Sequence, residues 1–188
     1  MQAKWFGDTR DLWKWTVAVR VAARREIVYV ALDRTPEEWK APDCEPVVHG
    51  YFRGGSRYED IAALGKAGGL TITSFLHPYH RLQWKEYLRP VIEHLAIKRR
   101  PGVLVLLDPD TGLWTKNPNS AHVRADEVTF VWEKLHPGDG LLVYQHRGRK
   151  GDDWWKPARD KLERHLDAKV VPYTNEHVDV ALLYAERL

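Results

Sequence analysis

The stretch Pro101–Gly112, which reads Pro-Gly-Val-Leu-Val-Leu-Leu-Asp-Pro-Asp-Thr-Gly, constrains the fold of this chain more than any other. Its apolar run Val103–Leu107 predicts a strand that is buried on both faces, as in a parallel sheet covered by helices. In open α/β sheets the ligand lies outside the carboxyl ends of the strands, and Asp108 and Asp110 fall at that place. We therefore expect the two carboxylates on a shaped loop in an active site. The alternative is that Asp108 caps a turn and Asp110 is merely solvated.

The rest of the chain predicts strands that alternate with helices. Strand patterns occupy residues 26–32, 70–76, 103–107, 140–144, 168–173 and 178–185, and helix patterns occupy 8–22, 58–64, 81–100, 128–135 and 155–166. Pro90 is expected to kink or restart the third of these helices. Residues 34–69 are rich in Pro and Gly and show no clear pair of strands. The pattern predicts one α/β domain over residues 1–188, with a doubly wound, mostly parallel, Rossmann-like sheet and a C-terminal antiparallel hairpin.

Composition places the chain among soluble globular proteins. Its 188 residues are 44% hydrophobic and 29% charged. No apolar run approaches the ~20 residues that cross a bilayer, and the N-terminus lacks a signal-peptide pattern, so we expect a cytoplasmic protein without a membrane partner. The single cysteine, Cys44, excludes an intramolecular disulfide and a zinc site built from cysteines.

A basic cluster follows the predicted strand 140–144 and suggests contact with nucleic acid. It contains Arg147, Arg149 and Lys150, and Trp154 comes shortly after it. Arginine and lysine would bind phosphates, and the indole ring would stack on a base. The alternative is a solvated surface, since the net charge of the chain is only +3.

The first predicted helix opens with charged residues at helical spacing. Asp8 has the position of an N-cap, Asp11 comes three residues later, and Lys14 lies one turn beyond on the same face. Asp33 ends the strand 26–32 as Asp108 ends the strand 103–107. Capping is the simplest role for Asp8 and Asp11, whereas an ion pair and a ligand contact are equally open to Lys14.

Two of these segments resemble motifs of a known family. Residues Gly7–Lys14 resemble the Gly-x-x-x-Asp-x-x-Lys segment that opens the adenine-N6 methyltransferase of large-subunit ribosomal RNA. Leu106–Asp110 resembles the Ile-Asp-Pro-Pro-Tyr motif of the same family, and the two motifs come in the same order. The sequence looks closer still to a bacterial group of uncharacterised activity that carries Gly-Asp-x-x-Asp-x-x-Lys, Leu-Asp-Pro-Asp-x-Gly and Tyr-x-His-x-x-Arg. The last motif is carried here by Tyr144, His146 and Arg149.

The resemblance implies a class I methyltransferase that uses S-adenosylmethionine and acts on nucleic acid or a nucleotide. Such enzymes have a mostly parallel sheet finished by an antiparallel hairpin. Asp108 would accept a hydrogen bond from the target amine of a flipped base, with Asp110 and His146 as further catalytic candidates. The residues that would position cofactor or substrate are Asp8, Asp11, Lys14 and Asp33. The chain departs from the family where Asp110 replaces a proline and Thr111 an aromatic residue, with Trp114 as the nearest ring, and where no glycine-rich turn follows residues 26–32.

Two other functions are consistent with the same residues. A metal-dependent nuclease or phosphodiesterase would bind Mg²⁺ or Mn²⁺ through Asp108, Asp110 and Glu127, with His146 nearby. Against it, Glu127 has the position of an acid in the first turn of a helix, and a histidine at a strand end can simply bond to backbone. The third possibility is a nucleic-acid-binding module without catalysis.

Overall fold

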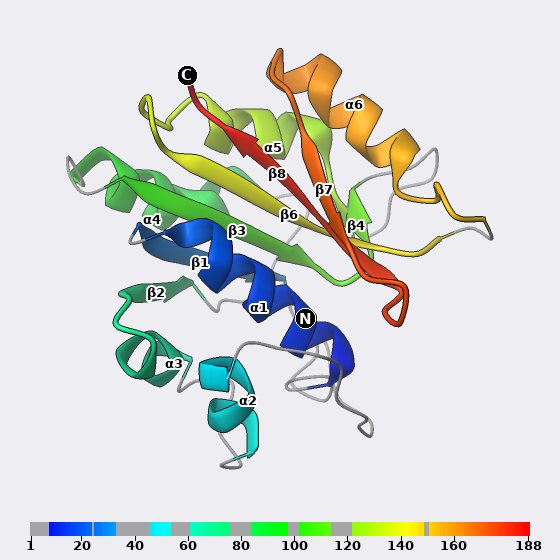
Figure 1. Ribbon diagram of the computed structural model, residues 1–188. Coiled ribbons are helices and arrows are strands. Elements are labelled where there is room, and N and C mark those ends of the chain that lie inside the picture. The colour runs from blue at the N-terminus through cyan, green and yellow to red at the C-terminus, as the bar shows by residue number, and fades with distance from the viewer. Residues whose placement is uncertain are drawn as a thin grey trace.

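A six-stranded mixed sheet forms the centre of the molecule, in the order β2-β1-β3-β6-β8-β7 (Figure 1). The computed structural model describes residues 8–23, 25–32, 46–53, 61–75, 84–97, 102–113, 122–148 and 151–188. The six strands are β1 (Glu26–Leu32), β2 (Ile72–Phe75), β3 (Val103–Pro109), β6 (Gly140–His146), β7 (Val171–Thr174) and β8 (Val180–Glu186). β2, β1, β3 and β6 are parallel, whereas β8 is antiparallel to both β6 and β7. The predicted α/β fold with a mostly parallel sheet and a C-terminal antiparallel hairpin is confirmed.

Helices cover both faces of this sheet. The helices are α1 (Thr9–Ala22), α2 (Pro46–Arg53), α3 (Ala62–Ala67), α4 (Trp84–Ile97), α5 (Ala125–Trp132) and α6 (Lys156–Leu166). The first three pack with one core cluster on one face, and the last three pack with a second cluster on the other (Figure 1). The strand Val103–Leu107 is therefore buried on both sides, as its continuous apolar pattern predicts.

Helix α1 begins as the sequence predicts. Asp8 is its N-cap, and Oδ1 of Asp8 accepts hydrogen bonds from the backbone N–H groups of Arg10 (2.8 Å) and Asp11 (2.9 Å). One side of the helix packs against the sheet through Trp15 and Ala18, both fully buried. This packing carries the charged residues of the first turns onto the sheet.

Several elements differ from the sequence prediction. β3 continues through Asp108 and Pro109, so the first carboxylate belongs to the strand rather than to the loop after it. α4 is a single helix with Pro90 inside it, so the helix does not restart there, and Leu88, Val91 and Leu95 pack it against the core.

Three short elements were not predicted. α2 lies in the proline-rich segment, and its first residue is Pro46, a position that tolerates proline. β4 (Gly112–Leu113) and β5 (His122–Val123) form a small parallel pair. α3 covers the end of the predicted helix 58–64, of which residues 58–60 lie outside the described residues.

The order of the strands defines where a ligand is expected. From β1 the chain passes to β2 on one side and then to β3 on the other, so the topology switches between β1 and β3. Ala31 pairs with Asp108 at the carboxyl ends of these two strands. Open α/β sheets bind their ligands outside the strand ends at such a switch point. No helix in the described part of the chain is long and apolar enough to cross a membrane.

Candidate functional site

A buried ammonium group connects α1 to β3. Nζ of Lys14 lies 2.7 Å from Oδ2 of Asp108 and also contacts the carboxylate of Asp11, one turn earlier on the same helix. Lys14 is completely buried, and Asp11 and Asp108 are 2% exposed. The structure therefore brings together the charged residues of two motifs that the sequence analysis identified separately.

Tyr29 is a further partner of Asp108. Its hydroxyl donates a 2.7 Å hydrogen bond to Oδ2 of Asp108, the atom that Lys14 also contacts. The two residues share a face of the sheet because Ala31 pairs with Asp108 and side chains alternate along each strand. Among the described residues, both hydrogen bonds of this carboxylate go to Oδ2. Oδ1 is therefore the atom that can accept a hydrogen bond from a ligand.

Three aromatic rings surround the ammonium group of Lys14. Nζ lies 5.6 Å from the ring centroid of Tyr29 and 5.9 Å from those of Trp15 and Tyr144. The rings of Trp15 and Tyr29 are themselves in edge-to-face contact, with centroids 4.9 Å apart. Aromatic faces attract a cation, so the rings add to the two carboxylates in holding the charge inside the protein.

Lys14, Asp8, Asp11 and Asp108 form what we call the Lys14 cluster, in which carboxylates outnumber ammonium groups. Burial raises the pKa of Asp11 to about 6, because the attraction of Lys14 offsets it only in part and the carboxylates of Asp108 and Asp8 add repulsion. Burial also raises the pKa of Asp8, although two backbone N–H groups and Arg10 oppose this. For Lys14, burial lowers the pKa, but Asp108 and Asp11 outweigh it and the net pKa is raised. The cluster thus has an excess of negative charge that favours positively charged ligand groups.

A second charged network joins α1 to the ends of β6 and β8. Nε and Nη2 of Arg10 donate to the two carboxylate oxygens of Asp179 at 2.7 and 2.8 Å, and Nε2 of His146 lies 3.2 Å from Oδ2 of Asp179. Hydrogen bonds from His146 and Arg10 hold the pKa of Asp179 well below its usual value. Nη1 of Arg10 is also 4.0 Å from Asp8, so this network adjoins the Lys14 cluster.

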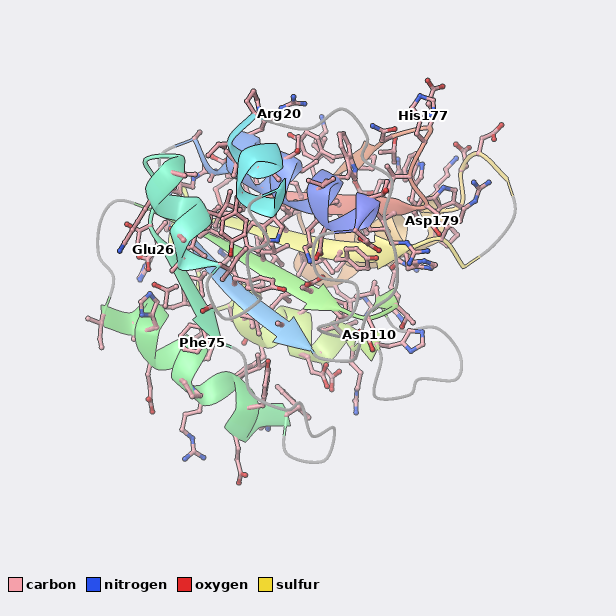
Figure 2. The ribbon with its side chains drawn as sticks, turned by 90° about the horizontal axis from the view of Figure 1, so that it is seen from below. Arg20, Glu26, Phe75, Asp110, His177 and Asp179 are labelled. Atoms are coloured by element: carbon pink, nitrogen blue, oxygen red, sulfur yellow. The ribbon has the colours of Figure 1, made fainter. Side chains whose placement is uncertain are left out.

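The candidate residues gather toward one end of the sheet. Figure 2 shows Asp110 and Asp179 toward this end and Glu26, the first residue of β1, toward the other. Asp110 follows β3 directly and is partly buried. Parallel strands deliver their carboxyl ends to one edge, which explains why residues so distant in sequence meet there.

The carboxylates of the metal hypothesis do not assemble in the described part of the chain. Glu127 is buried in the first turn of α5, where Oε2 accepts a 2.9 Å hydrogen bond from the backbone N–H of Arg124. The described residues, which include Asp108, Asp110 and Glu127, contain no group of three or more His, Cys, Asp or Glu side chains that could hold a metal. Helix capping accounts for Glu127, as its position in the sequence allows.

The candidates for phosphate binding are described only in part. Arg147 is exposed. Its Nη2 donates a 3.0 Å hydrogen bond to the carbonyl oxygen of Gly151, and its backbone N–H donates a 2.8 Å hydrogen bond to the carbonyl oxygen of Asp179. Trp154 is partly buried and packs against the core. Three predicted site residues, Asp33, Arg149 and Lys150, lie outside the described residues, as does Trp114.

Tyr29, Arg10 and Asp179 were not among the site residues proposed from the sequence. Tyr29 stands in an apolar strand, and its signal was the hydroxyl, which needs a partner when it is buried. Asp179 gave no signal, because its partner Arg10 is 169 residues away in the sequence.

Comparison with known proteins adds no identity to this geometry. No protein-family model matches the chain, and no curated protein matches it. The arrangement itself offers a carboxylate oxygen at the switch point, a fixed orientation for that carboxylate, and negative charge around it.

Proposed function

We propose that this chain is an S-adenosylmethionine-dependent, methyltransferase-like protein that acts on nucleic acid or a nucleotide. One observation carries the proposal: Lys14, from the motif that opens α1, forms an ion pair with Asp108, from the Leu-Asp-Pro-Asp motif of β3. Both motifs resemble those of a nucleic-acid methyltransferase family. A doubly wound sheet that ends in an antiparallel hairpin is typical of the same class.

The charge of the cluster suits this cofactor. S-adenosylmethionine carries a sulfonium and an ammonium group, and it supplies the methyl group. Asp8 and Asp11 provide negative charge beside Asp108, and this charge attracts the sulfonium and ammonium groups. Asp33 follows the carboxyl end of β1 in the sequence, where it would bind the ribose.

The roles of the chain's own residues follow from their contacts. Asp108 accepts a hydrogen bond from the target amine through Oδ1, while Lys14 and Tyr29 fix its orientation through Oδ2 and are positioning residues. Nε2 of His146 lies 3.2 Å from Oδ2 of Asp179, so this carboxylate orients the imidazole ring at the edge of the site. Arg147 and Arg149 are assigned to phosphate by their place in the basic segment that follows β6 in the sequence.

A methyl-transfer assay tests the proposal. We expect radiolabelled S-adenosylmethionine to label RNA or single-stranded DNA in the presence of the protein, and we expect Asp108→Asn to abolish labelling. Glu93→Gln, an exposed carboxylate on α4, is the control and should label normally.

Two results would replace this function with another. Cleavage that depends on Mg²⁺ or Mn²⁺ and is lost in Asp108→Asn would indicate a nuclease. Salt-sensitive binding of nucleic acid without methyl transfer, weakened in Arg147→Ala, would indicate a binding module.

A further inference from the structure

A groove runs over α5, on the face of the sheet that α4, α5 and α6 cover. Its volume is about 990 Å³, at the upper end of the range for ligand sites. Thr129 and Phe130 of α5 form its floor, Trp84 and Lys85 of α4 one wall, and Arg164 and His165 of α6 the other. Figure 1 shows these three helices on one side of the sheet, away from α1.

The walls of the groove carry positively charged side chains that form no ion pair with a carboxylate of the described part of the chain. Nζ of Lys85 lies 5.5 Å from the centroid of the Trp84 ring. Nε of Arg164 donates to the carbonyl oxygen of Asp160. Nδ1 of His165 lies 2.8 Å from the carbonyl oxygen of Lys161. Within the described residues, neither Lys85 nor Arg164 forms an ion pair. These groups therefore favour an anionic ligand.

The carboxylates of the groove do not cancel this charge. Asp126 is paired with Arg124 through two hydrogen bonds of 2.6 and 2.9 Å, so that pair is neutral. Glu133 is the remaining acid in the lining, against Lys85, Arg164 and the titratable His165.

Aromatic rings lie beside the positive groups. The rings of Trp84 and Phe130 meet edge to face, with centroids 5.4 Å apart and planes at 85°, and both side chains are only partly buried. Proteins that bind single-stranded nucleic acid combine a basic groove with aromatic rings on which bases stack. The groove has both features.

We propose that this groove binds a single strand of nucleic acid, with a base against Trp84 and Phe130 and phosphates at Lys85 and Arg164. The inference rests on the proposed function for its choice of ligand and adds a second surface for the same substrate. α4 and α5 follow strand ends at the carboxyl edge, so Trp84 and Arg124, although on the opposite face from Asp108, stand toward the same edge of the sheet. A strand in the groove would thus lead toward the proposed site.

Fluorescence anisotropy with labelled oligouridylate and oligothymidylate tests the groove. We expect Lys85→Ala/Arg164→Ala to bind at least about tenfold more weakly, with the salt slope reduced by about 1.4, the value for two lost phosphate contacts on a single strand. Trp84→Leu, which keeps an apolar side chain but removes the stacking ring, should weaken binding about fivefold or more. Arg89→Ala, on α4 but outside the lining, is the control and should bind as wild type.

Circular dichroism first checks that the variants are folded. The inference is overturned if the folded double variant binds the oligonucleotides with wild-type affinity, or if Arg89→Ala loses as much affinity as the double variant. Binding of either oligonucleotide with the expected losses supports it. Binding of S-adenosylmethionine is measured separately, so failure of the groove and failure of the proposed cofactor are distinguishable.

Discussion

Nζ of Lys14 lies 2.7 Å from Oδ2 of Asp108, and the two residues are 94 positions apart in the sequence. Both are buried, so the ion pair is removed from solvent. Taking charges out of water is costly, and a buried pair is stable only when the partners satisfy one another. Asp11, Tyr29 and the aromatic rings around Lys14 supply the additional contacts.

Removal of the ammonium group should strongly destabilise the protein. Lys14→Met keeps the length of the side chain but leaves the carboxylates of Asp11 and Asp108 facing one another, and breaking a buried pair in this way costs about 3–5 kcal/mol. Urea unfolding measures the change. Lys14→Met/Asp108→Asn should regain part of the loss, and Lys66→Met, exposed on α3, should change little. A loss below about 1 kcal/mol in Lys14→Met would refute the pairing.

The raised pKa of Asp11 predicts a specific dependence of stability on pH. Its pKa is 3.8 in the reference state and about 6 in the folded chain. Between about pH 4 and 6 the folded state therefore holds more protons, so the free energy of unfolding falls as the pH rises through this window and then levels off. Asp8 has a raised pKa and contributes with the same sign. The slope between these values should be smaller in Asp11→Asn, and an equal slope would contradict the assignment.

Asp179 should act in the opposite direction and in a different window. Its pKa is lowered, so its contribution to stability is present above about pH 4 and is lost as the pH falls toward its folded pKa. Asp179→Asn should therefore flatten the acid limb of the stability curve below about pH 4. The fall in the free energy of unfolding between about pH 4 and 6, which Asp11 causes, should remain in this variant. Because Asp179 is 39% exposed, we expect a small effect that weakens further at high salt.

Gly112 should resist substitution. Its φ is +106°, and an added Cβ would lie 2.6 to 2.7 Å from atoms of the Gln145 side chain. Gln145 in turn binds the backbone of Leu113 and His146, so the strain would reach the end of β6. Thermal unfolding should show a loss of at least about 2 kcal/mol in Gly112→Ala. Gly148→Ala meets open space and should stay within about 0.5 kcal/mol of wild type.

The sequence predicted local elements better than it predicted the contacts of the site. The apolar run Val103–Leu107 and the capping role of Asp8 follow from short patterns, and both are confirmed. The sequence placed Lys14 on a helix but did not distinguish an ion pair from a ligand contact. That choice depends on Asp108, which only the sheet topology brings to Lys14. Tyr29 was not among the predicted site residues, because a single hydroxyl in an apolar strand is a weak signal.

Titration of the folded protein with S-adenosylmethionine in a calorimeter tests the central claim most directly. We expect saturable binding by wild type and at least about tenfold weaker binding by Asp11→Asn, which removes negative charge beside Asp108, with Glu93→Gln as an unchanged control. A wild-type sample that is folded by circular dichroism and gives no heat of binding would contradict the account.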